Sequence, residues 1–176
     1  MRRFVLAGLV LALLPTVAFA QSSTSPRVGP VAGSQEFTLS GTGSSNNDFN
    51  NGSFGLSGSY GQYINPNLMW GLRQNLTWAD NGPSSWIGST RLALDYHFGD
   101  GKLRPFVGAN IGVVYGDDVE GTGIVSPELG LKYYVNPTTF IMGMAEYQVF
   151  FEDSDDINSN FDDSAFVYTV GMGFNF

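Results

Sequence analysis

The sequence predicts an all-β fold, an eight-stranded, antiparallel, up-and-down transmembrane β-barrel. Eight segments alternate large apolar residues with small or polar ones, and this period of two is typical of strands. The connections between the segments alternate between short and long, and glycine is abundant, at 23 of 176 residues. The clearest segment is 166–176, whose large apolar side chains share one face: Phe166, Tyr168, Val170, Met172, Phe174 and Phe176.

Residues 1–20 predict a secretory signal peptide. Two arginines precede an apolar run over 4–14, a proline ends the run, and the small-x-small triplet at 18–20 predicts cleavage. Residues 21–34 are rich in Ser, Pro and Gly without periodicity, so we expect a flexible leader there. The barrel is expected over residues 35–176.

Composition narrows the class of protein. The chain has no cysteine, so an exported domain of this size must be held by a large core or a closed hydrogen-bonded sheet. It carries 16 acidic against 8 basic residues, which argues against nucleic acid as a partner. Beyond the signal no apolar run approaches the roughly 18 residues of a spanning helix. A closed barrel is the other structure that satisfies every backbone group in lipid.

The strands and turns can be placed from the same pattern. Short connections at 65–67, 99–101 and 136–138 contain Asn, Pro or Gly, which favour tight turns. An even number of strands puts both ends of the barrel on this short-turn side. We expect longer polar connections at 44–52, 79–85, 116–123 and 152–163. We expect strands at 36–43, 53–63, 68–78, 86–98, 103–115, 125–135, 140–151 and 166–176, the first two being diluted by Gly and Ser.

The two faces of the strands differ in a way that separates a membrane barrel from a soluble one. In a soluble barrel or sandwich the aromatic face would be the core, and the other face would be rich in solvated Lys, Glu and Thr. Small residues instead suit the crowded interior of a narrow barrel, and aromatic residues near strand ends suit the two lipid interfaces. The second face carries many glycines: Gly55, Gly61, Gly71, Gly108, Gly112, Gly130, Gly171 and Gly173.

Charges of both signs also fall on this second face. Ions in a narrow interior must be paired or hydrated. We therefore expect a network of ion pairs that fills the lumen, so that the barrel conducts little; a polar path for protons or a substrate is the alternative. The expected network consists of Glu36, Arg73, Arg91, Asp95, Glu128, Lys132 and Glu146.

The signal peptide, the strand opening Arg104-Pro105-Phe106-Val107-Gly108-Ala109-Asn110-Ile111-Gly112 and the ending Phe174-Asn175-Phe176 carry a family resemblance. With them the chain resembles the small eight-stranded outer-membrane barrels of Gram-negative bacteria, of the OmpA, OmpX and OmpW kind. The resemblance implies a place in the outer membrane, with lipid and lipopolysaccharide as neighbours. It also implies that Phe174 and Phe176 form the signal read by the barrel-assembly machinery.

We expect one of two main functions, the second of which is implied by the resemblance to OmpW. The first is a structural, envelope-integrity or surface-interaction role through the loops. The second is a narrow channel or transport route for small, hydrophobic molecules. Modification of lipid A is a weaker third possibility, since barrels with that activity are similar in size.

His97 is the sole histidine, and it is expected on the lumen face near the short turns. The serine of the lipid A deacylase motif is absent after it, and palmitoyltransferases of this kind work at the opposite rim. We therefore expect a rim histidine that is hydrogen-bonded or solvated, and no catalytic residue, cofactor or metal site.

Acidic residues gather in two of the predicted long connections. Carboxylate oxygens suit Ca²⁺ or Mg²⁺, although no EF-hand spacing is present. Solvated charge that shares divalent cations with lipopolysaccharide is the plainer interpretation. These residues are Asp117, Asp118, Glu120, Glu152, Asp153, Asp155, Asp156, Asp162 and Asp163.

Overall fold

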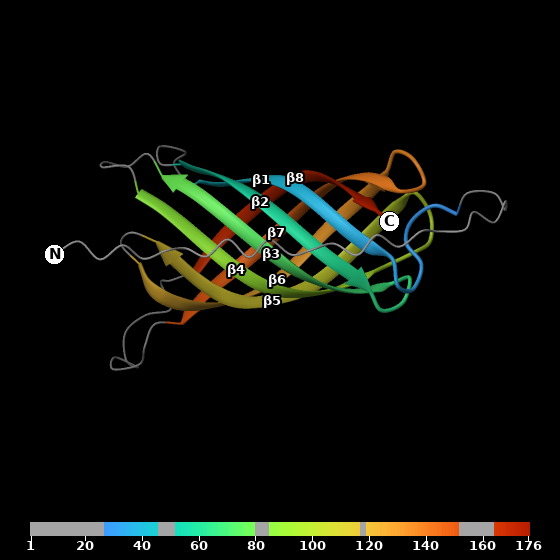
Figure 1. Cartoon of the computed structure of the whole chain (residues 1–176). Helices are drawn as coiled ribbons and strands as arrows, with labels where there is room; N and C mark the ends of the chain where they lie inside the picture. Colours follow the sequence, from blue (N-terminus) through green and yellow to red (C-terminus); the bar gives the residue numbers. More distant parts are fainter. Residues whose placement is uncertain (1–26, 46–51, 80–84, 117–118, 152–163) are drawn as a thin grey trace.

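The computed structural model describes residues 27–45, 52–79, 85–116, 119–151 and 164–176. Eight antiparallel strands follow one another around a closed barrel, as the sequence predicts (Figure 1). The described residues contain no helix long and apolar enough to cross a membrane. The strands are β1 (Gln35–Ser45), β2 (Gly52–Tyr63), β3 (Leu68–Ala79), β4 (Ser85–His97), β5 (Leu103–Gly116), β6 (Val119–Tyr134), β7 (Thr139–Phe151) and β8 (Ser164–Asn175).

Strand β8 closes the barrel by pairing with β1. The register runs from Glu36 opposite Asn175 to Gly43 opposite Tyr168. Just beyond it, the backbone N–H of Gln35 donates to the carbonyl of Phe176 at 2.8 Å, and the reverse bond is 2.9 Å. The described sheet therefore has no free edge along β1 and β8.

Three tight turns lie together at one end of the barrel, the end at which β8 finishes (Figure 1). The side-chain carbonyl of Asn65 accepts from the backbone N–H groups of Asn67 and Leu68, both at 2.9 Å. Asn136 does the same for the turn between β6 and β7. These asparagines hold the turns because their side chains replace a backbone acceptor.

The connection between β5 and β6 is shorter than predicted. The sequence pattern assigned 116–123 to a long loop, but β6 already begins at Val119, which pairs with Gly116 across a register irregularity. The glycines at 121 and 123 dilute the alternation, yet they are compatible with a paired strand. The other three predicted long connections lie largely outside the described residues.

Part of the predicted leader makes hydrogen bonds to the barrel. Residues 27–34 pack across the short-turn end, and we call them the strap. The N–H of Gly29 donates to the carbonyl of Pro137 at 2.9 Å, and that of Gly33 to the carbonyl of Tyr63 at 2.8 Å. Both glycines have positive φ, and Pro30 between them is fully buried. Residues 1–26, including the predicted signal peptide, lie outside the described part.

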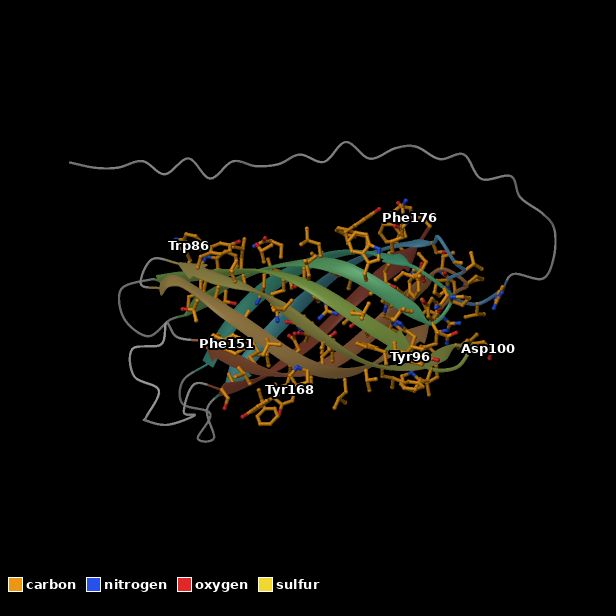
Figure 2. All side chains as sticks on the ribbon, turned by 90° about the horizontal axis from the view of Figure 1, so that it is seen from below. Trp86, Tyr96, Asp100, Phe151, Tyr168 and Phe176 are labelled. Atoms are coloured by element: carbon orange, nitrogen blue, oxygen red, sulfur yellow. The ribbon has the colours of Figure 1, made fainter. Side chains whose placement is uncertain are left out.

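The two faces of the barrel wall are arranged as predicted. Large apolar side chains on alternate positions point outward and are exposed, with Val170 at 72%. Figure 2 shows Trp86 and Phe151 near one end of the barrel, and Tyr96 and Phe176 toward the turn end marked by Asp100. An exposed apolar band between two aromatic belts is the surface of a barrel that spans a membrane.

Candidate functional site

The structure places all seven predicted lumen residues inside the barrel, each at most 8% exposed. They occupy alternate inward positions on β1, β3, β4, β6 and β7. They form two clusters, a central one and one near the short turns. The central cluster contains Arg73, Arg91, Asp95, Glu128 and Glu146, and the turn-end cluster contains Glu36 and Lys132.

Arg73 organises the central cluster. Both of its terminal nitrogens donate to the Glu128 carboxylate at 2.6 Å, and Nη2 also donates to Asp95 Oδ2 at 2.8 Å. Its Nη1 lies 3.8 Å from Glu146 Oε1. The planar guanidinium presents donors in a fixed fork, so one cation serves carboxylates from three other strands.

A second arginine and an asparagine complete this cluster. Arg91 Nη1 donates to Glu146 Oε1 at 2.8 Å. The amide nitrogen of Asn110 donates to both Glu128, at 2.6 Å, and Glu146, at 2.7 Å. Sequence reasoning missed Asn110, because it considered only charged residues; its inward position between two lumen glycines was the available signal.

The turn-end cluster surrounds Lys132. Its ammonium group contacts both oxygens of Glu36, at 2.6 and 2.8 Å. The same carboxylate accepts from the hydroxyl of Tyr63 at 2.8 Å and from the amide of Asn175 at 3.0 Å. The ammonium also lies 4.7 Å from the ring centre of Phe140, within cation–π range. Sequence reasoning also missed the polar partners Tyr63 and Asn175.

Glycines make room for these groups, as the sequence predicts. A Cβ at Gly108 would overlap the carboxylate of Asp95, and one at Gly130 would overlap the ring of Phe106. A Cβ at Gly173 would lie 2.5 Å from the Phe140 ring. Larger residues at these positions would force the lumen side chains apart.

Buried side chains also line the rest of the described lumen. Toward the β6 start, a layer of Ser89, Ser126 and Thr169 is followed by apolar Ile124 and Val167, all buried. At the short-turn end, the guanidinium of Arg104 lies against Gly29 of the strap, donates to the carbonyl of Pro66 at 3.2 Å and lies over the Tyr134 ring.

His97 lies inside this end of the barrel, as predicted, but it is not a solvated rim residue. It is fully buried, with its ring 5.4 Å from that of Tyr63 and 5.2 Å from that of Phe106. The sequence placed it correctly near a turn but gave no sign of the strap that covers this end.

The acidic residues predicted as cation ligands lie outside the described residues, apart from the backbone of Glu120 in β6. Among the side chains that the structure describes, no group of three or more His, Asp or Glu is placed to hold a metal ion.

Phe174 and Phe176, the predicted assembly signal, both point outward and are exposed. Phe174 packs against Phe37 of β1 and against Phe176, with ring centres 5.8 and 5.5 Å apart. Their position at the closing seam is thus described, while their role in assembly stays a prediction.

Solved structures share this architecture. OprG from Pseudomonas aeruginosa superposes with a TM-score of 0.61 at 12% identity, covering 84% of this chain and 98% of that one. Neisserial surface protein A gives 0.57 at 14% identity, covering 81% and 94%. The N-terminal barrel domain of P. aeruginosa OprF gives 0.55 at 20% identity, covering 82% and 98%. No protein-family model and no curated protein sequence matches the chain. The chain therefore has the fold of the small eight-stranded outer-membrane barrels.

Proposed function

We propose that this protein is a closed barrel of the outer membrane with a structural or surface-interaction role rather than a pore. The observation that supports the proposal best is the ion-pair network across the lumen. Arg73 alone links β3 to β4 and β6 through bonds of 2.8 Å or less. An ion that crossed the barrel would have to break such bonds and leave buried charges unpaired, which is strongly unfavourable.

Single-channel recording from the purified barrel in planar bilayers tests this proposal. We expect no large, steady open conductance from the native protein. The variant R73Q removes the central cation, and it should raise the conductance if the network is what blocks the lumen. A native barrel with a large, steady conductance would overturn the proposal.

The surface role would reside in the acidic segments at the rim opposite the short turns. The chain places Asp117 and Asp118 between β5 and β6, and further acidic residues between β7 and β8. Divalent cations could join these carboxylates to the phosphates of lipopolysaccharide. With Ca²⁺ present, D117N/D118N should bind lipopolysaccharide vesicles less than the native protein does. When a chelator removes Ca²⁺, the two proteins should bind equally. If the two proteins bind equally both with Ca²⁺ and with the chelator, these two residues are not part of the proposed surface.

A lateral transport route is the second candidate, and one observation favours it. Pro127 has no N–H, and the β6–β7 register passes from Val125 opposite Val149 to Glu128 opposite Glu146 with no pairing between. Pro127 faces outward beside the small side chain of Ala109. Uptake of a small hydrophobic dye by liposomes, lowered in P127V, would favour this route; equal uptake by both would exclude it.

We propose no enzymatic role. What supports this is the burial of the sole histidine, His97, between two rings, away from any lipid substrate. Lipid A from cells that carry H97A should match lipid A from cells with the native protein by mass spectrometry. Loss of a modification in the H97A cells would contradict this proposal.

A further inference from the structure

Arg104 of β5 is a buried cation without an acidic partner among the described residues. It lies at the short-turn end of the lumen and is 1% exposed. The other lumen cations each lie within 2.8 Å of a carboxylate oxygen, whereas none of the ion pairs between described residues includes Arg104. Asp100, the acidic residue of the preceding turn, is exposed and is not paired with it. Because an unpaired buried charge is strongly unfavourable, we expect a counter-ion here.

One edge of the Arg104 guanidinium is free to take such a counter-ion. The rest of the group has neighbours: a Cβ at Gly29 of the strap would lie 2.9 Å from Cζ, and Nη1 donates to the carbonyl of Pro66 at 3.2 Å. Nε and Nη2 are also buried, but they have no hydrogen-bond partner among the described residues. The N–H groups of these two nitrogens point the same way. This edge of a guanidinium matches two oxygens of a phosphate or carboxylate.

The neighbouring cluster cannot supply the missing negative charge. Lys132 stands directly opposite Arg104 in the β5–β6 register, so two cations lie side by side. Glu36 already accepts from Lys132 at 2.6 and 2.8 Å, from the Tyr63 hydroxyl at 2.8 Å and from the Asn175 amide at 3.0 Å. The described lumen residues at this end therefore hold two fixed cations and one carboxylate.

His97 brings further unpartnered nitrogens to the same end of the lumen. It is paired with Phe106, two residues along β5 from Arg104, so His97 and Arg104 are diagonal neighbours on the inward face. Both ring nitrogens of His97 are buried and have no hydrogen-bond partner among the described residues. A ring N–H beside a free guanidinium edge gives a set of donors that suits an anion.

We propose that Arg104 and His97 bind one phosphate group beneath the strap. A water molecule can accept from these donors but cannot balance the charge. The two oxygens of a carboxylate would both be used by the arginine edge, whereas a phosphate keeps a further oxygen for His97. The strap is joined to the barrel by bonds from Gly29 and Gly33, so it can lift to admit the anion without breaking the strand ladders. Short turns of such barrels face the periplasm, so the phosphate is either dissolved there or carried by a lipid headgroup.

Inorganic phosphate is the first probe. Titration calorimetry on the purified barrel in a nonionic glycoside detergent, at constant ionic strength set with chloride, should show one phosphate bound per barrel. R104Q should bind at least tenfold more weakly, and R104K, which keeps the charge but lacks the two-pronged edge, about three- to tenfold more weakly. R27Q is the matched control: it removes an exposed arginine from the strap and should bind like the native barrel.

Phosphatidic acid is the second probe, because it carries its phosphate monoester on a lipid. Native mass spectrometry of barrels released from nanodiscs of phosphatidic acid and excess phosphatidylcholine counts the phosphatidic acid retained. Retention by the native barrel but not by R104Q, without binding of inorganic phosphate, would support a headgroup site, and the reverse a site for dissolved phosphate.

Binding of neither probe by the native barrel, or equal binding by R104Q and the native barrel, would overturn the proposal. The shift in SDS electrophoresis between heated and unheated samples checks that each variant is folded. If R104Q does not fold, R104K decides in its place, and native-like binding of both probes by R104K would then overturn the proposal.

Discussion

The centre of the lumen and its short-turn end are both closed by buried ion pairs, but with different chemistry around them. At the centre, the fork of Arg73 holds carboxylates from several strands, with Asn110 as a further donor. At the short-turn end, the compact ammonium of Lys132 has one carboxylate, Glu36, and a surround of aromatic rings. The centre therefore depends on a shared cation, whereas the end depends on one pair, ring packing and the strap.

The largest effect is expected from removing the shared cation. R73Q leaves the buried carboxylates of Asp95 and Glu128 without their main partner, and losing one member of a buried pair costs about 3–5 kcal/mol. Urea unfolding in vesicles should show this loss of unfolding free energy. A loss below about 1 kcal/mol would mean that the two carboxylates are not held as ions by Arg73.

A smaller loss is expected at the short-turn end. E36Q leaves the Lys132 ammonium with the Tyr63 hydroxyl and the faces of three rings, each worth about 0.5–2 kcal/mol. Its loss of unfolding free energy should therefore be smaller than that of R73Q. The double variant E36Q/K132M should recover most of the loss, because replacing a buried pair by apolar packing is often neutral. If the double variant instead lost as much unfolding free energy as E36Q and K132M together, the comparison between the two clusters would be wrong.

The strap should contribute less again. Gly29 and Gly33 have φ of 88° and 86°, so alanine is strained at both, by about 1–2 kcal/mol. At Gly29 the Cβ would also lie 2.9 Å from the Arg104 guanidinium carbon, whereas at Gly33 it meets nothing within 4 Å. G29A should therefore lower the unfolding free energy more than its matched control G33A. Equal losses would show that the contact with Arg104 is unimportant.

The smallest effect on stability is expected from an exposed ring on the outer surface of the short-turn end. F176A removes an exposed ring but keeps the two backbone bonds to Gln35. We expect a change in unfolding free energy below about 1 kcal/mol, together with slower insertion by the barrel-assembly machinery. Pulse-chase measurement of folded barrel in cells tests this. V170A, at another exposed outward position on β8, is the control; equal insertion rates for the two variants would remove Phe176 from the assembly signal.

The sequence predicts the barrel and the face of the wall on which each charged residue lies, because a period of two assigns each residue to a face regardless of register. It cannot say which carboxylate each cation contacts, since Arg73 meets Asp95 and Glu128 only after register and strand stagger are set. The strap could not be predicted from the sequence for a different reason. It is held by hydrogen bonds from Gly29 and Gly33 to residues far away in the sequence, and a local pattern rich in Gly and Pro carries no sign of them.

We expect the seam between β1 and β8 to be the last part of the barrel to form. The hydrogen bond from Asn175 to Glu36 joins residues 139 positions apart, and contacts of such long range form late because the loss of chain entropy precedes them. Until then the sheet is an open ribbon with two unpaired edges, and Glu36 lacks one of its partners. The Glu36–Lys132 pair would thus reach its final surroundings only when the ribbon closes, so a probe of that pair would time the last step of barrel formation.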